Sequence, residues 1–436
     1  MTMNYRKIFL CVASLVALSA TAAAQDGKTL RLSLDEAQRY AVEHNAAMQN
    51  ATLDVKKAEA DRWKTLSAML PSVKAGYDYQ NMCGYKMEMH MGPTSINIPM
   101  DPTGNLSVTA SVAVNGAMVV GTMMQNIAIE MSDITRKQTE QTTCSNVKNV
   151  YVSILVMEQT VGLLDSSLAN MERLAATSQA SVDVGAAEQV DADKLQVQVA
   201  TLRSSINSTR RSMQALRNTL LLQLGADVDA ELELTTGMDE ILNVESAARM
   251  LGEGFDITKN YNYQLLEQSE KLAKRQVTMA WMDFSPTIMA FYQYSKKYHY
   301  GETGMDMTPP NMVGASVSVP LLTTGTRIAG IKSAKIAYEE SVNSRRQAED
   351  GLKVQYNQLS YDLASALETY DIQSRNLELT QRVFANVTEK YRYGRASSLE
   401  VTTASTDIIT AQSNYIQAVM NVISAQISLE NLLNNE

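Results

Sequence analysis

The sequence predicts a mainly α-helical chain with a small β part, and three observations indicate this fold class. All eight prolines fall within residues 71–102 and 286–320, which leaves two long tracts without the residue that breaks helix interiors. One of these tracts carries a heptad pattern typical of coiled-coil packing. Segments that alternate apolar and polar residues, as strands do, occur at the two proline windows.

The first 24 residues have the pattern of a secretory signal peptide. Arg6 and Lys7 form a basic start, residues 8–18 are apolar, and residues 22–24 offer a small-residue cleavage site. The apolar run is too short to span a membrane, and no later stretch reaches about 18 apolar residues, so we expect an exported chain without a transmembrane helix. Because Cys11 lies inside the apolar run, we expect no lipid anchor.

Charge and cysteine content exclude several function classes. Cleavage removes two positive charges and no acids, so the net charge moves from −9 to −11, which disfavours nucleic-acid binding. The mature chain keeps Cys83 and Cys144, which lack metal-ligand spacing; we expect two thiols, with a disulfide between them as the alternative. No nucleophile–base pair or phosphate-binding glycine loop stands out, so the sequence predicts neither an enzyme nor a cofactor.

The helical tracts predict coiled coils. The heptad seam runs over residues 352–391, stepping by alternate fours and threes from Leu352 to Tyr391. We expect helices over 35–69, 117–183, 187–224, 246–284, 321–393 and 396–433. At about 1.5 Å per residue, each long helix reaches roughly 100–110 Å and each short one about 52–58 Å. Two short helices laid end to end therefore match one long helix, which predicts a rod.

The strands come from an internal repeat. "VKAGYDYQ" (73–80) recurs as "IMAFYQYS" (288–295), and "VTASVAV" (108–114) recurs as "VGASVSV" (313–319). We therefore expect β-hairpins at about 72–115 and 287–319, four strands in all, each with one apolar face. Such strands suit an outer-membrane barrel, with an interfacial aromatic girdle formed by Tyr77, Tyr79, Tyr292 and Tyr294. A soluble sandwich is the alternative, although the long helices offer no second sheet.

Two glycines complete the repeat. Gly185 and Gly394 each stand between a long helical tract and the next one, where glycine supplies the positive φ that follows a helix. The chain therefore divides into a signal peptide (1–24) and a tandem repeat (25–436). The repeat has a first half (25–224), a connecting segment (225–245) and a second half (246–436).

Taken together, these features resemble the TolC-type outer-membrane efflux channel family (outer membrane factors) over essentially the whole mature length. The residues that carry the resemblance include "LSLDEAQRYAVEHNAAM", "SVSVPLLTTGTRIAGIKSAK" and "YGRASSLEVTTASTDIITAQSNYIQAV". The resemblance implies a homotrimer in the outer membrane of a Gram-negative bacterium. Its long antiparallel helices would form a periplasmic α-barrel, and its strands a 12-stranded transmembrane β-barrel. The strand count by itself allows closure by two, three or four chains.

The implied function is a passive exit duct for small compounds, served by an inner-membrane pump and a periplasmic membrane-fusion adaptor. Gly185 and Gly394 would mark the adaptor-docking helix tips. Glu400 matches the family's acidic position at the periplasmic constriction, and Asp191 and Asp193 are its counterparts in the first half. The alternative for each acid is a carboxylate that complements the dipole at a helix N-terminus.

Other functions remain open at this stage. A periplasmic coiled-coil adaptor or scaffold would need the helices but not the strands, and a type I protein secretion duct would share the fold. A metal (copper-type) efflux duct is a third alternative. Its weak metal-ligand candidates are Met87, Met89, His90 and Met91, because thioether and imidazole groups suit Cu(I). The chain holds 25 Met, so a general enrichment explains most of this cluster.

Overall fold

The computed structural model describes residues 29–91, 94–252, 254–301, 309–321 and 325–434, so the predicted signal peptide lies outside the described residues. The chain forms two compact units, and neither corresponds to a sequence half. The first unit contains residues up to 49, 139–255 and 354 onward, and the second contains 50–138 and 256–353. Each unit therefore combines segments from both halves of the repeat.

Most of the predicted helices are present. The long helices are α4 (Gly116–Asp183) and α9 (Thr326–Arg392), and both continue from one unit into the other. Two helices of 36 residues each, α5 (Gln189–Leu224) and α10 (Ser398–Leu433), follow them. The helix expected over 35–69 is instead two helices, α2 (Leu34–His44) and α3 (Ala46–Ser67). They separate at Asn45, whose backbone is extended and whose side-chain amide donates to the carbonyl of Gln223, 2.6 Å away.

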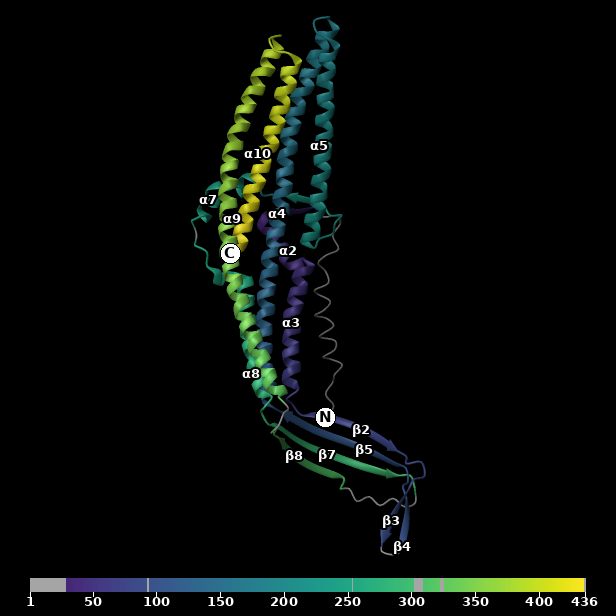
Figure 1. The fold of residues 1–436 in the computed structure, drawn as a ribbon. Coiled ribbons are helices and arrows are strands. Elements are labelled where there is room, and N and C mark those ends of the chain that lie inside the picture. The colour runs from purple at the N-terminus through teal and green to yellow at the C-terminus, as the bar shows by residue number, and fades with distance from the viewer. Residues whose placement is uncertain (1–28, 92–93, 253, 302–308, 322–324, 435–436) are drawn as a thin grey trace, which may run out of the picture. The chain divides into compact units, whose positions relative to one another are not determined.

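In the first unit, α4 and α5 pack as an antiparallel pair (Figure 1). Apolar residues spaced by threes, fours and sevens fill the seam, among them Leu164, Met171, Leu195 and Leu202. Three ion pairs flank this seam at seven-residue steps on both helices: Arg203–Glu172 at 2.6 Å, Arg210–Asp165 at 3.0 Å and Arg217–Glu158 at 2.8 Å. These exposed pairs add little stability individually, but their spacing fixes one register.

A second core in this unit joins the N-terminal segment to the connecting segment. The parallel pair β1 (Leu30–Leu32) and β6 (Leu232–Leu234) packs near the fully buried Tyr151 of α4. The Tyr151 hydroxyl donates to the carbonyl of Leu32 at 3.1 Å and accepts from the amide of Thr236 at 3.0 Å. The connecting segment thus forms a small extra element that contains β6 and α6 (Met238–Ile241), and α7 (Val244–Met250) begins at its end.

The predicted helix over 246–284 is wrong at its start. After α7 come a turn at Gly252 and a 3-10 helix, Ile257–Lys259, and α8 spans only Tyr261–Met282. Asn260 caps α8, since its side chain accepts from the amides of Asn262 and Tyr263. Helix α9 begins at Thr326 rather than 321, and residues 322–324 lie outside the described part.

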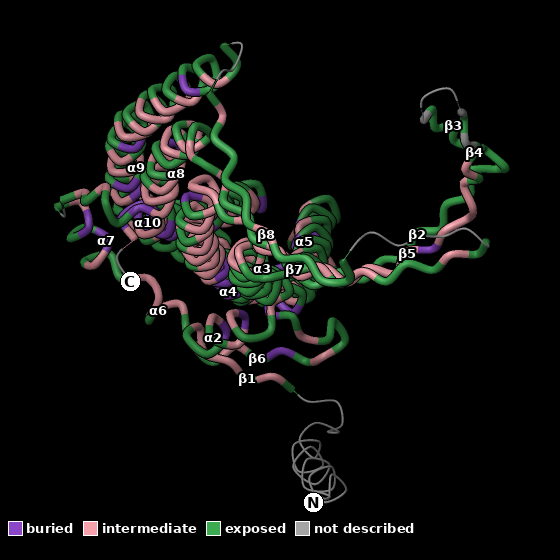
Figure 2. Tube along the Cα trace, turned by 90° about the horizontal axis from the view of Figure 1, so that it is seen from below, coloured by how far each residue is buried: buried purple, intermediate pink, exposed green. Residues whose placement is uncertain are grey.

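The second unit also contains the antiparallel sheet, whose strand order is β2-β5-β7-β8 (Figure 1). Its strands are β2 (Ser72–Gln80), β5 (Thr103–Val114), β7 (Thr287–His299) and β8 (Asn311–Ser318), which confirms the four predicted strands. The first predicted hairpin also carries an unpredicted one, β3 (Lys86–Met91) with β4 (Thr94–Pro99). Figure 2 shows these strands as mainly exposed or half-buried, and β2 is exposed along its whole length.

One described helix is apolar enough to cross a membrane by length and composition. Helix α4 contains an 18-residue window of mean hydropathy 1.2. The sequence analysis expected no such stretch after the signal peptide, and this window was overlooked. A third of that window is buried, and the core helix of a coiled coil has the same composition. A single such helix is weak evidence for a membrane span.

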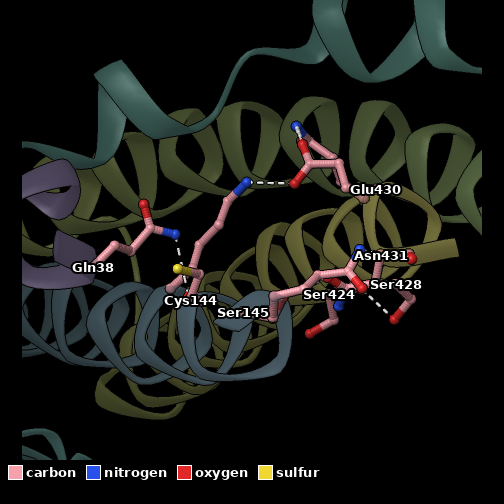
Figure 3. Close-up of polar contacts among 10 residues, drawn as sticks. Gln38, Cys144, Ser145, Ser424, Ser428, Glu430 and Asn431 are labelled. Atoms are coloured by element: carbon pink, nitrogen blue, oxygen red, sulfur yellow. Dashed lines mark hydrogen bonds and ion pairs between the residues drawn. The ribbon is translucent and has the colours of Figure 1, made fainter. Parts of the chain in front are cut away.

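Polar side chains join α4 to the last turns of α10 (Figure 3). The Lys148 ammonium lies 2.6 Å from a carboxylate oxygen of Glu430, and the Ser145 hydroxyl donates to Asn431. The Gln38 amide donates to the carbonyl of Cys144 at 3.2 Å. Among the described residues, Cys83 is exposed, Cys144 is half-buried, and they form no disulfide.

Candidate functional site

The two helix tips of the first unit have the same backbone geometry. Gly185 has φ +73° and Gly394 has φ +67°. At each tip, the glycine amide bonds to the carbonyl three residues back, and the following amide bonds to the carbonyl five residues back, at 2.8–2.9 Å. This is the Schellman ending of a helix, in which a left-handed residue satisfies the last carbonyls. The structure thus places both predicted tip glycines in helix-ending turns.

The second tip continues into a capping box. Ser397 lies three residues after Gly394 and caps α10, and its hydroxyl accepts from the amide of Glu400 at 3.2 Å. In return, one carboxylate oxygen of Glu400 accepts from the Ser397 amide at 2.7 Å. Glu400 is exposed, and this box fixes its carboxylate at the start of the helix. Glu400 therefore acts at the helix N-terminus, which is the alternative that the sequence analysis gave to a role in the constriction.

The first tip uses its acid differently. Asp191 occupies the same position relative to Gly185, but the residue at the cap is Glu188, whose side chain makes no capping hydrogen bond. Asp191 instead accepts from the hydroxyl of Ser398, the first residue of α10, and its carboxylate lies 3.7 Å from the Lys194 ammonium. Ser398 is only 4% exposed. The two tips are thus joined across the repeat by one buried hydroxyl.

Asp193 lies two residues further along α5. It is exposed and accepts from the side-chain amide of Gln189 at 2.8 Å. In a single chain, then, Asp191 is engaged with α10, Glu400 with its own cap, and Asp193 with its own helix. The acids share one end of the unit but do not form a cluster by themselves.

The register of the sheet gives it one apolar face. Residues paired across antiparallel strands point to the same side, and one face is mainly apolar, with Lys296 and Asn311 as its polar members, while the other is mainly polar but includes Met289, Phe291 and Met312. Six rows lie on one face: Val114–Ile288–Val317, Val112–Ala290–Ala315, Val73–Ala110–Tyr292–Val313, Ala75–Val108–Tyr294–Asn311, Tyr77–Leu106–Lys296 and Tyr79–Gly104–Tyr298. The opposite face carries mostly Ser, Thr, Asn, Gln and Lys.

The four predicted girdle tyrosines all lie on this apolar face, but at different heights. Tyr77 and Tyr79 are in the two rows farthest from the helices, whereas Tyr292 and Tyr294 are in the central rows. Tyr300 lies beside Tyr77 and Tyr79 at the end of the sheet remote from the helices. The Tyr300 and Tyr77 hydroxyl oxygens are 2.7 Å apart, and the ring centroids of Tyr300 and Tyr79 are 5.9 Å apart in an edge-on arrangement. The sequence reading overlooked Tyr300, although it continues the alternation of β7.

The methionine-rich segment forms the β3–β4 hairpin. Met87 pairs with Ile98 and Met89 with Ile96, while His90 pairs with Ser95 on the alternate positions. The pleat therefore places His90 on the opposite face from Met87 and Met89, while the side chain of Met91 lies outside the described part of the structure. No group of three or more His, Cys, Asp or Glu in the described part of the chain is arranged to hold a metal. The hairpin thus separates the candidate imidazole ligand of His90 from the thioethers of Met87 and Met89.

Comparisons with known proteins agree with this architecture. The outer membrane efflux protein family matches residues 260–435. None of the curated proteins matches the sequence significantly.

Solved structures match nearly the whole chain. The outer membrane protein VceC of Vibrio cholerae is 13% identical with a TM-score of 0.72, and the match covers 92% of this chain and 95% of VceC. The channel CusC is 15% identical with a TM-score of 0.74 and 95% coverage of both chains. The open MtrE channel of Neisseria gonorrhoeae is 15% identical with a TM-score of 0.72, covering 92% of this chain and 88% of MtrE.

Residues 260–435 match the outer membrane efflux protein family, and the fold matches solved outer-membrane channels over 92% or more of the chain. Both matches agree with the resemblance to TolC-type channels found in the sequence. The outer-membrane location expected from the sequence is confirmed by the same matches. The matched CusC and MtrE structures are channels.

One further tip residue was accessible from the sequence but overlooked. Ser397 and Glu400 form the pattern S-x-x-E, which predicts a capping box at a helix start. The sequence contains no comparable pattern for the hydrogen bond between Asp191 and Ser398. These residues are far apart in the chain, so local sequence does not indicate that they are in contact.

Proposed function

We propose that three chains form the outer-membrane exit duct of a tripartite efflux system, which passively exports small compounds delivered by an inner-membrane pump through a periplasmic adaptor. The observation that carries this proposal is the apolar face of the four-stranded sheet. Neither β2 nor β8 has a second strand partner among the described residues. Open edges of this kind are satisfied in a membrane only by closure into a barrel.

The dimensions of the apolar face support a membrane-spanning role. Along β5 it extends from Gly104 to Val114, or about 34 Å at roughly 3.4 Å per residue. Tilted by about 40°, such a strand gives a band about 25 Å tall, the height of the lipid-facing band of outer-membrane barrels. In addition, β2 and β8 are antiparallel, so one subunit's β8 can pair with the next subunit's β2 in an unbroken antiparallel ring.

The aromatic residues support an orientation within this proposal. Tyr77, Tyr79, Tyr298 and Tyr300 would form the girdle at the outer interface, at the strand ends remote from the helices. Lys296 lies over the Tyr298 ring at 5.3 Å, a position from which its ammonium reaches the interface while its stem stays in the apolar band. Tyr292 and Tyr294 would face lipid nearer the middle.

Adjacent residues on opposite faces of β5 provide a matched test. Val108→Arg places a charge in a central row of the apolar face, whereas Thr109→Arg places it on the polar face. A central lipid-facing arginine costs about 2–4 kcal/mol in outer-membrane barrels. We therefore expect Val108→Arg to lower the amount of assembled protein in outer-membrane fractions, and Thr109→Arg to leave it near wild type. Equal tolerance of both changes would reject the lipid-facing assignment.

The number of subunits is tested separately. We expect the purified protein to have about three times the mass of one chain once bound detergent is subtracted. A stable monomer or dimer would contradict the trimer. A periplasmic adaptor or scaffold would instead remain soluble or fractionate with the inner membrane, so the same fractionation distinguishes the rival class.

The β3–β4 hairpin bears on which cargo the duct carries. The separation of His90 from the methionine positions on β3 weakens the proposal of copper efflux, and small compounds remain the preferred cargo over metal ions or a secreted protein. A deletion strain should therefore keep its copper tolerance while becoming sensitive to dyes and detergents. Copper sensitivity in that strain would restore the metal proposal.

A further inference from the structure

Helix α9 exposes a straight line of apolar side chains in the first unit. They are between 48% and 72% exposed and follow one another at steps of 7, 11, 7 and 4 residues, which are close to whole numbers of helical turns: Val354, Tyr361, Ile372, Leu379 and Val383. The fully buried Leu363 stands nine residues, or two and a half turns, from both Val354 and Ile372. This line, the α9 stripe, therefore lies on the helix face opposite the one that packs within the chain.

Helix α5 exposes a second line with similar spacing. Steps of 7, 7, 4, 7 and 7 residues join its apolar and small members, all of them exposed: Val190, Val197, Ser204, Ser208, Ala215 and Leu222. The buried Ile206 stands nine residues from both Val197 and Ala215. This line, the α5 stripe, therefore faces away from the seam with α4, and its small members leave room for the larger side chains of a facing helix.

The two helices lie at opposite edges of the first unit. Figure 1 shows α9 at one edge and α5 at the other, with α10 and α4 between them, and Figure 2 shows the same order. Contiguous exposed apolar surface of this kind marks an interaction site. In a closed ring of identical chains, one edge of each copy meets the opposite edge of the next. The α9 stripe of one copy would then face the α5 stripe of its neighbour.

The helix tips set the heights of the two stripes. Within one chain, a hydrogen bond from the first residue of α10 to the first turn of α5 holds the tips at one level. Rotation about a ring axis parallel to the helices keeps that level in every copy. A residue of α9 therefore meets the α5 residue that is equally far from its own tip glycine, Gly394 or Gly185. Val383 stands 11 residues before Gly394 and Val197 stands 12 after Gly185, so the two valines come to nearly the same height.

Opposite charges flank the stripes at matching positions. Glu368 of α9 and Arg211 of α5 are both exposed, and each stands 26 residues from its tip glycine. Each also precedes a stripe residue by four, since Ile372 follows Glu368 and Ala215 follows Arg211. In a pair of antiparallel helices, positions with the same offset from the contact line lie on the same side of it. The carboxylate and the guanidinium therefore face each other across the predicted contact.

We propose that the α9 stripe is the docking surface for the α5 stripe of a second copy of this chain, in the antiparallel register that pairs Glu368 with Arg211 of the partner subunit. The inference rests on the proposed ring of three chains and extends it, because it names the helix faces and the register that join the copies. The apolar members drive association by leaving water, and the charges fix the register. A periplasmic adaptor is the rival occupant, but its docking would not require the two stripes of one chain to match each other in spacing and charge.

Disulfide trapping in outer membranes tests the register on the full mature chain. The background carries Cys83→Ser and Cys144→Ser. In it, the pair Val383→Cys with Val197→Cys should give covalent dimers and trimers after mild oxidation, seen on a non-reducing gel. The control pair Val383→Cys with Leu222→Cys keeps both positions in the stripes but moves one of them by 25 residues, or about 38 Å. This control and each single-cysteine chain should run as monomers.

Charge reversal tests the ion pair independently. Glu368→Lys and Arg211→Glu should each lower the temperature at which the trimer dissociates in detergent, and the double variant should recover at least half of the loss. The control Glu378→Lys reverses an exposed charge of α9 that lies roughly a third of a turn away from the stripe. Its combination with Arg211→Glu should show no recovery.

The detergent-corrected mass separates this inference from the proposed function. A monomer mass would overturn both the ring and the helix contact. A trimer in which the Val383–Val197 pair gave no more covalent product than the Leu222 control would overturn the contact alone. Crosslinks from these cysteines to another protein in place of a second copy would assign the stripes to an adaptor and overturn it as well. A Glu368–Arg211 double variant with no recovery would refute the proposed register.

Discussion

Glu400 offers the sharpest test of the helix tips, because the structure gives it one role and the family resemblance gives it another. In the structure its carboxylate accepts from the Ser397 amide at 2.7 Å, within a capping box. In the proposed trimer, three Glu400 carboxylates would also surround one axis and favour cations at the periplasmic entrance. The two roles depend on different properties, since capping needs an acceptor oxygen and selectivity needs charge.

Three substitutions separate these properties. Glu400→Gln keeps an acceptor that fits the capping box but removes the charge. Ser397→Ala removes a capping side chain but keeps the charge, and Glu400→Ala removes both the acceptor and the charge. Loss of the cap costs about 0.5–2 kcal/mol per helix, whereas loss of the charge at the helix start costs about 0.3–1 kcal/mol. Ser397→Ala should therefore lower the thermal unfolding temperature at least as much as Glu400→Gln.

Single-channel recording in planar bilayers measures the second role. Glu400→Gln and Glu400→Ala should both weaken cation selectivity and block by multivalent cations, or raise conductance. Ser397→Ala should retain wild-type selectivity. All three proteins should remain trimers in detergent. If Glu400→Gln left conductance, selectivity and block unchanged, Glu400 would be a capping residue only, and the constriction would lie elsewhere. If Ser397→Ala did not change stability, the capping argument would fail.

Three further predictions concern stability. Tyr151→Phe should cost about 1–3 kcal/mol, because it leaves the Thr236 amide without its partner, while the Leu32 carbonyl keeps its hydrogen bond from the Thr235 amide; unchanged thermal unfolding by circular dichroism would contradict this. Gly394→Ala should destabilise the protein by about 1–2 kcal/mol, because φ is +67° there. The control Gly351→Ala, within α9 and in open space, should be neutral or stabilising. The same unfolding measurement compares the two variants, and equal effects would refute the strain argument. Hydrogen bonds from the Ser33 backbone and side chain lower the pKa of Glu36, so its stabilisation is complete above the unfolded value of about 4.3 and is lost as pH falls through the lower folded value. Glu36→Gln should therefore flatten the acid side of the stability profile, and an unaltered profile would exclude this contribution.

Much of the fold was accessible from the sequence because its signals are local. The proline-free tracts predicted α4, α5, α9 and α10, since a missing helix breaker and a heptad period act within one segment. Alternation predicted the four strands for the same reason. The positions of Gly185 and Gly394 predicted the helix-ending turns, because the left-handed backbone is a property of the single residue.

Local errors arose where two signals competed. The tract 246–284 contains good helix formers, but Gly252 and the Asn260 cap interrupt it, so α8 begins only at Tyr261. Asn45 similarly divides α2 from α3, because its side chain bonds to the distant Gln223 carbonyl. The second case depends on a tertiary partner, and no reading of residues 35–69 alone would reveal it.

The sequence by itself predicted the long helices, the strands of the four-stranded sheet, the tip turns and the resemblance to outer-membrane channels. Only the tertiary structure decided that β5 of the first half pairs with β7 of the second, and that Asp191 accepts from Ser398. It also decided that His90 lies on the opposite face of the β3–β4 hairpin from Met87 and Met89. These contacts join residues that are far apart in the chain or depend on strand register. Their free energies come from packing and desolvation in three dimensions, which the local periods of a sequence do not encode.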